Sequence, residues 1–130
     1  MSRSSSSTDP QQVRDFAIEA ARLLHDRKLE NVLVLDVRGL SNVCEYVVLG
    51  SGTSGRQMKS VATEIEKLGK ESGFPPFRES RDPSISWVVA DFVDVVVHLF
   101  EPQQRAYYDI ETLWQGAPRV AWRRSAADAS

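Results

Sequence analysis

The chain has very few of the side chains that disulfide-bonded or metal-dependent proteins use. Its 130 residues include one cysteine, Cys44, and two histidines, His25 and His98. A single cysteine excludes an internal disulfide, which favours a reducing compartment, and we expect a cytoplasmic protein. The three side chains lack the spacing of zinc ligands, so we expect no metal and no other cofactor. His98 lies in an apolar run and is expected to be a structural histidine with one nitrogen hydrogen-bonded.

Long apolar runs and an excess of charge are lacking as well. No stretch approaches the roughly 20 apolar residues that a membrane-spanning helix needs. The first ten residues, MSRSSSSTDP, have no apolar centre of a secretory signal and are typical of a short disordered lead. The net charge of −2, with 42% hydrophobic and 26% charged residues, indicates a globular domain and not a surface that coats nucleic acid. We therefore expect no membrane partner and no required contact with nucleic acid.

Apolar residues recur at helical spacing in three segments. The first helix is predicted over residues 10–28. The second begins after Ser54, a good N-cap, and ends at Gly69 or Gly73. The third begins at Pro102, which suits a first helical turn. Its predicted apolar face consists of Ala106, Tyr107, Ile110, Leu113 and Trp114.

Between the helices, short β-branched runs predict two hairpins. The expected strands are residues 32–37, 45–49, 86–90 and 94–100, and an edge strand is weakly indicated within 78–86. The order helix, hairpin, helix, hairpin, helix is not the strict alternation of a doubly wound fold. It predicts an α/β protein of α+β character, with a single mixed sheet flanked by helices. We expect a disordered lead at 1–8, one domain at 9–118 and a tail at 119–130.

A G-x-G-x-x-G motif follows the second predicted strand, at Gly50, Gly52 and Gly55. It suggests a nucleotide-binding enzyme, because such glycines let a helix N-terminus approach a phosphate. A dinucleotide site also needs a second strand ending in an acidic residue about 20 residues on, and that region is Gly-Phe-Pro-Pro-Phe at 73–77. Asp91 and Asp94 lie across a turn and do not form the carboxylate pair that would hold magnesium. We therefore expect no catalytic residues, and the nucleotide-binding enzyme is the alternative.

A tryptophan in the second hairpin is the strongest candidate for contact with another protein. Strand alternation places Trp87, Val89 and Asp91 on one face, with Val88 and Ala90 on the other. An exposed tryptophan near a carboxylate is typical of a docking hot spot. Trp87 could equally cover the rim of the core.

Together, these segments resemble the ribosomal silencing factor family, also called Iojap, from about residue 12 to Pro118. Four signatures occur in order. They are LDVRGLS at 35–41 with CEYVV at 44–48, SGTS at 51–54 with RQ at 56–57, WVVADF at 87–92 with DVVVHLF at 94–100, and RAYY at 105–108 with IE at 110–111 and LW at 113–114. The chain departs from the family pattern at Glu45, where aspartate is usual, and at Gly55, where glycine is not.

The resemblance implies a nucleotidyltransferase-like fold without catalytic carboxylates and a protein that is not an enzyme. It implies a translational repressor that binds the large ribosomal subunit through the subunit's fourteenth protein and sterically blocks joining of the small subunit. It also implies a homodimer when free, and a large-subunit assembly factor using the same docking site is an alternative. By family analogy, the expected partner-binding residues are Trp87, Val88 and Val89 as apolar contacts, and Asp91 and Arg105 as polar contacts.

Overall fold

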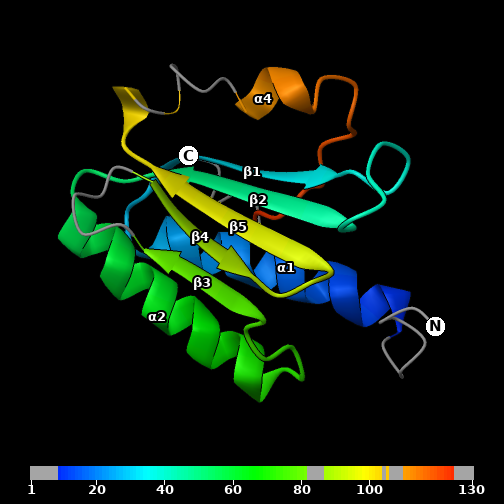
Figure 1. The fold of residues 1–130 in the computed structure, drawn as a ribbon, viewed down its shortest axis with the longest axis horizontal. Helices are drawn as coiled ribbons and strands as arrows, with labels where there is room; N and C mark the ends of the chain where they lie inside the picture. The colour runs from blue at the N-terminus through cyan, green and yellow to red at the C-terminus, as the bar shows by residue number, and fades with distance from the viewer. Residues whose placement is uncertain (1–8, 82–86, 104, 106–109, 125–130) are drawn as a thin grey trace.

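Five strands form one mixed sheet in the order β1-β2-β5-β4-β3 in the computed structural model, which describes residues 9–81, 87–103, 105 and 110–124 (Figure 1). The central pair, β2 and β5, is parallel, and all other neighbouring strands are antiparallel. This confirms the prediction of a single mixed sheet built from two hairpins. The strands are β1 (Glu30–Asp36), β2 (Tyr46–Ser51), β3 (Arg78–Arg81), β4 (Trp87–Asp91) and β5 (Val95–Phe100).

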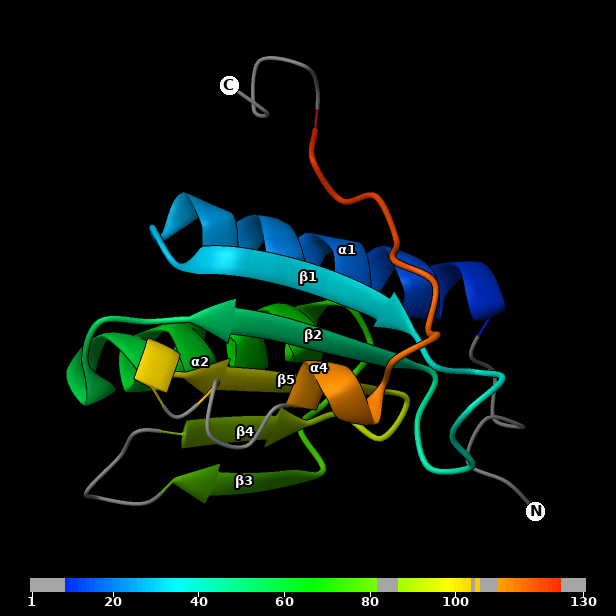
Figure 2. The ribbon, with the colours of Figure 1, turned by 90° about the horizontal axis from the view of Figure 1, so that it is seen from above.

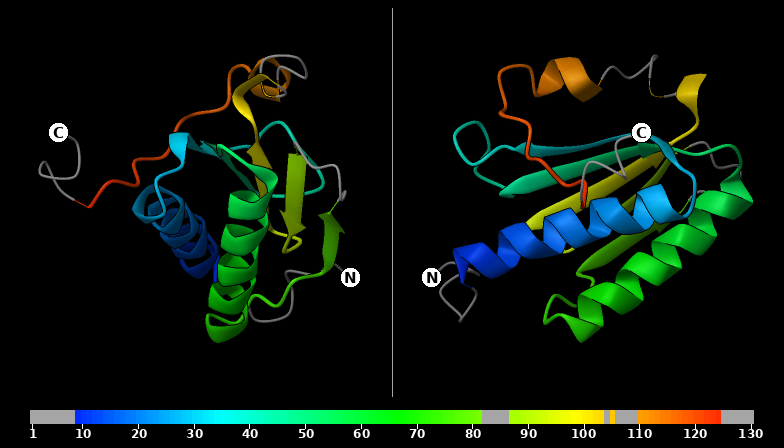
Figure 3. Two further views of the ribbon diagram at one scale, coloured as in Figure 1. Left: turned by 90° about the vertical axis from the view of Figure 1, so that its left-hand side faces the viewer. Right: turned by 180° about the vertical axis from the view of Figure 1, so that it is seen from behind.

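Two long helices cover one face of the sheet, and a short helix lies on the other (Figures 1 and 3). They are α1 (Pro10–Asp26), α2 (Gly55–Glu71) and the short α4 (Ile110–Leu113). The side chain of Ser54 accepts a hydrogen bond from the Gln57 amide at the start of α2, which confirms the predicted cap. Gly73 follows the end of α2 with φ +88°, a conformation that glycine adopts without steric cost. None of the described helices is both long and apolar enough to cross a membrane.

The main core lies between the sheet and the two long helices. α1 contributes its predicted stripe, and α2 contributes buried residues that recur every three or four positions. The Phe16 ring stacks on the Phe74 ring with 4.9 Å between their centroids, and it meets the Phe92 ring edge-on with 5.0 Å between their centroids. The core side chains from the sheet include Val34, Tyr46, Val48, Val88, Ala90, Val97 and Leu99.

A second, smaller cluster lies on the opposite face of the sheet, which we call the open face. It consists of Leu35, Val37, Cys44, Val47, Leu49 and Phe100, with Trp87, Val96 and Trp114 packed at its margin. Trp114 follows α4, so the short helix covers part of this face (Figure 2). The third predicted helix is therefore only partly confirmed. Gln104 and residues 106–109 lie outside the described part of the chain, and Leu113 is 67% exposed instead of lying on an apolar face.

The segment after α4 packs against the sheet, unlike the predicted tail that begins at residue 119. The Asp36 amide donates to the Pro118 carbonyl at 2.9 Å, and the Val120 amide donates to the Val34 carbonyl at 2.8 Å. Val120 and Trp122 are buried in the main core. The segment thus covers the free edge of β1, whose backbone groups would otherwise be unpaired. The packed part of the chain extends at least to Trp122.

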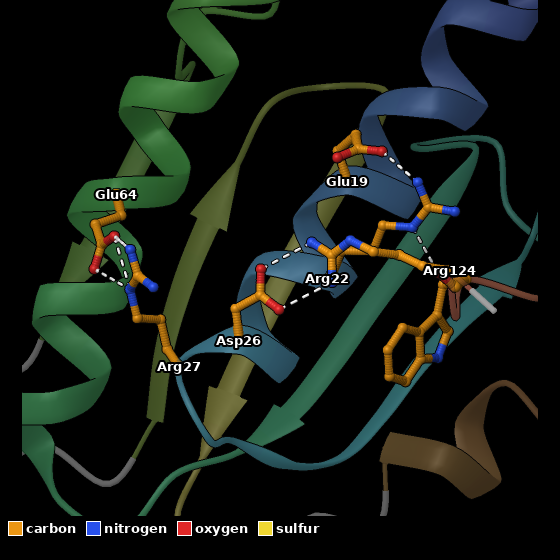
Figure 4. A network of polar contacts seen from close by, with 7 residues as sticks. Glu19, Arg22, Asp26, Arg27, Glu64 and Arg124 are labelled. Atoms are coloured by element: carbon orange, nitrogen blue, oxygen red, sulfur yellow. Dashed lines mark hydrogen bonds and ion pairs between the residues drawn. The ribbon is translucent and has the colours of Figure 1, made fainter. Parts of the chain in front are cut away.

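Ion pairs on the outside join the two long helices and the C-terminal segment (Figure 4). Arg27 at the end of α1 pairs with Glu64 of α2, with 2.6 Å between Nη2 and Oε1. Arg124 pairs with Asp26, with 2.8 Å between Nη2 and Oδ2. These side chains are 36% to 49% exposed. Exposed pairs stabilise a fold by at most about 1 kcal/mol each, so burial of Trp122 contributes more than the ion pairs around it.

Candidate functional site

Strand β4 presents alternate residues to the two faces of the sheet, as predicted. Trp87, Val89 and Asp91 are half-buried on the open face, whereas Val88 is 1% exposed and Ala90 is 2% exposed beneath the helices. Val88 therefore belongs to the main core, and the prediction that it contacts a partner is not supported. The pleat of the strand is the reason, because neighbouring side chains point to opposite faces.

Trp87 lies in an aromatic cluster with two residues of β5. Its indole Nε1 donates a hydrogen bond to Nδ1 of His98 at 3.2 Å. Its ring centroid lies 5.9 Å from that of His98 and 5.3 Å from that of Phe100. The β4–β5 register places Trp87 opposite Phe100 and Val89 opposite His98. The cluster fixes the indole on the open face, and the expected structural role of His98 is confirmed.

Burial lowers the pKa of His98 to about 4, although the nearby Asp91 carboxylate raises it by attracting the charged imidazolium. The neutral imidazole is the form that accepts the Trp87 hydrogen bond. His98 is therefore neutral throughout the physiological range, and its ring acts as a support for the tryptophan.

The low pKa of His98 predicts a loss of stability in acid. In the unfolded chain, the His98 imidazole is protonated below about pH 6.5. In the folded chain, it is not protonated until the pH falls to about 4. The free energy of unfolding should fall across this window by no more than about 3 kcal/mol from His98. Urea titrations of the wild type and His98→Gln between pH 7 and pH 4 measure this loss of free energy. Glutamine is chosen because it can accept the indole hydrogen bond without titrating. If the free energy of unfolding falls equally with pH in the two proteins, His98 does not have the lowered pKa.

Asp91 closes the β4–β5 hairpin. Its Oδ1 accepts a hydrogen bond from the Val93 amide at 2.8 Å, and Val93 has φ +74°. This side chain-to-backbone bond supports a strained turn. Asp94, the other carboxylate considered for magnesium, is buried. No group of three or more potential metal ligands occurs among the described residues.

Arg105 points inward, contrary to the prediction of a polar contact for a partner. It is 6% exposed, and it links the chain before α4 to the end of β2. Its Nε donates to Glu111 Oε1 at 3.0 Å and its Nη1 donates to Ser51 Oγ at 2.9 Å. Burial of a guanidinium is tolerated only when it is paired in this way. In this conformation Arg105 supports the open face from within and is not a surface contact.

The glycine motif has a packing explanation. A Cβ at Gly50 would lie 2.9 Å from Leu24 Cδ1, and one at Gly52 would lie 2.5 Å from Met58 Cγ. Two of the loop amides are also occupied, since the Gly52 amide donates to Phe100 O and the Thr53 amide donates to Gln57 Oε1. A phosphate-binding loop needs free amides directed at the ligand. Gly50 and Gly52 therefore allow close contact between the strand and the helices.

Sequence reasoning missed several exposed apolar residues at one end of the sheet. Phe77 is 65% exposed, and its amide donates to the Asp91 carbonyl at 2.7 Å. Leu40 and Val43, in the β1–β2 loop, are 54% and 75% exposed. The two prolines before Phe77 indicated only a loop, and single exposed apolar residues have no periodic signal.

Comparison with known proteins identifies the family. The family described as "Ribosomal silencing factor during starvation" matches residues 10–130. The ribosomal silencing factor of Halalkalibacterium halodurans is 36% identical over 101 residues, covering 78% of this chain and 86% of the relative. The chloroplastic Iojap protein of Zea mays is 30% identical over 112 residues, covering 86% of this chain and 49% of the relative.

The fold agrees with a solved structure of a similar protein. A crystal structure of a protein from Chromobacterium violaceum superposes with a TM-score of 0.73 at 33% sequence identity, covering 92% of this chain and 97% of that one. Members of the matched family act as non-catalytic, ribosome-binding factors. The sequence match, the mixed sheet and the internal use of the glycine loop agree, and the chain belongs to the ribosomal silencing factor family.

Proposed function

We propose that this silencing factor binds the large ribosomal subunit through the subunit's fourteenth protein and sterically blocks joining of the small subunit. The family description, silencing during starvation, supports an action on the ribosome. A steric block needs only bulk at the subunit interface, and it requires neither turnover nor a cofactor.

The proposed docking surface is centred on Trp87, with Val89 and Asp91 beside it on β4 and Phe77 next to Asp91. The observation that carries the proposal is the half-buried indole on the sheet face that α1 and α2 leave uncovered. Aromatic residues held rigidly at the centre of an interface contribute most of the binding free energy. His98 and Phe100 hold the indole in this way.

Charge favours such an encounter. The chain carries a net charge of −2, and ribosomal proteins are generally basic. Attraction between opposite charges raises the rate of association, and salt screens it. The complex should therefore form more slowly as ionic strength rises.

The proposal is tested by sedimenting the purified protein through a sucrose gradient with separated ribosomal subunits. We expect it to travel with large subunits and not with small subunits, and to reduce formation of joined ribosomes when both are mixed. An assembly factor would instead bind large-subunit precursors and leave joining of mature subunits unchanged. If the protein stays at the top of the gradient with large subunits present, the proposal is wrong.

We also propose that the free chain is a cytoplasmic homodimer. Light scattering of the purified protein measures the oligomeric state directly, because the chain mass is 14.6 kDa. A mass near that of one chain at micromolar concentration would contradict the dimer.

A further inference from the structure

A pocket of about 340 Å³ opens on the open face at the carboxyl ends of the parallel strands β2 and β5. Ser51 ends β2 and lies opposite Phe100, the last residue of β5. The carboxyl ends of parallel strands are the usual place for ligands in open α/β sheets, because backbone groups and loops converge there. The pocket size is within the range of about 300–1,000 Å³ that binds small molecules in proteins.

One wall of the pocket is the buried guanidinium of Arg105. Its bonds to Glu111 and Ser51 use Nε and Nη1, and Nη2 makes no hydrogen bond within the described part of the chain. A buried N–H group without an acceptor costs about 1–3 kcal/mol, more when charged, so an acceptor at this position would be bound strongly. The two existing bonds also fix the guanidinium plane in advance.

Two further polar side chains line the same pocket without protein partners among the described residues. Arg119 lies opposite Leu35 in an antiparallel bridge, which directs it to the open face. Asn31 has φ +52°, and the β1–β2 register shifts between Glu30 and Leu33. Such irregularities in a strand redirect side chains and are common next to binding sites.

The charges of the pocket favour an anion. Arg105 and Arg119 supply two positive charges against the single carboxylate of Glu111. Guanidinium groups bind phosphate through paired hydrogen bonds. Of the remaining polar groups, Asn31 and Ser51 can donate to or accept from hydroxyl groups, and the Glu111 carboxylate can accept from them.

We propose that this pocket binds a small organic phosphate that carries hydroxyl groups, such as a sugar phosphate. The phosphate lies between Arg105 and Arg119, and the hydroxyl groups contact Asn31 and Glu111. The three glycines of the loop are not part of this site, because none of them lines the pocket. The isolated protein would bind this ligand whether or not it also binds the ribosome.

Isothermal titration calorimetry of the full chain with ribose 5-phosphate, inorganic phosphate and ribose tests the proposal. We expect ribose 5-phosphate to bind with the highest affinity and ribose not to bind. Arg119→Ala removes an exposed side chain and should weaken binding by about tenfold or more. Asn31→Gly keeps the left-handed backbone and should also weaken binding. Arg56→Ala, an exposed arginine on α2 outside the pocket, is the control with the same change of charge.

Four results would overturn the proposal. The first is no saturable binding of ribose 5-phosphate to the wild type. The second is binding that Arg119→Ala and Asn31→Gly leave unchanged, or that Arg56→Ala weakens equally. The third is inorganic phosphate binding as tightly as ribose 5-phosphate, which would leave no role for the hydroxyl groups. The fourth is binding that Arg105→Lys leaves unchanged, because lysine keeps the charge but not the planar geometry of the guanidinium.

Discussion

Trp122→Ala is expected to lower the free energy of unfolding by about 3–5 kcal/mol, the usual range for truncating a buried tryptophan. The side chain is 7% exposed, and its Nε1 donates to the Val32 carbonyl at 3.2 Å. It also lies 5.4 Å from the His25 ring of α1. Alanine would leave a cavity between α1 and β1 and an unpaired carbonyl. Urea denaturation at neutral pH measures the change.

The same substitution at Trp114 is the matched control, because that tryptophan is only half-buried on the open face. Trp114→Ala should lower the free energy of unfolding clearly less than Trp122→Ala does. If Trp122→Ala costs no more than Trp114→Ala, the C-terminal segment is not part of the core in solution. The prediction thus tests directly whether the folded domain continues beyond Pro118.

Trp87→Ala is expected to weaken binding to the large subunit by at least about 2 kcal/mol, or roughly thirtyfold in affinity. The indole packs against half-buried His98 and buried Phe100, and removing it takes away the contact area that these two rings hold in place. In the sucrose gradient, the variant should stay at the top at concentrations where the wild type travels with large subunits.

Trp87→Phe separates packing from hydrogen bonding, because it keeps an aromatic ring at this position and loses the Nε1 bond to His98. We expect it to retain most of the binding. Thermal melting of both variants shows whether they are folded. A folded Trp87→Ala protein that still sediments with large subunits would refute the proposed docking surface.

The secondary structure was largely readable from the sequence. The stripe on α1, the cap at Ser54 and the β-branched runs are local patterns, and each was borne out by the corresponding element. The alternation along β4 was also read correctly, since a strand has a fixed period of two. The family followed from motifs that are contiguous in the chain.

The placement of Val88 and Arg105 could not be read in the same way. The period of β4 separates Val88 from Trp87, but it does not say which face the helices cover. Arg105 is buried because Ser51, 54 positions earlier in the chain, lies beside it. A contact of that sequence separation leaves no local signal.

Local periodicity, capping and contiguous motifs predict the elements and the family, and a single cysteine excludes an internal disulfide. The packing of the segment after Pro118 against the edge of β1 became visible in the three-dimensional structure alone. Only that structure placed Arg105, Arg119 and Asn31 around one pocket. Burial and pairing depend on which strands become neighbours, and the order β1-β2-β5-β4-β3 joins residues that are far apart along the chain.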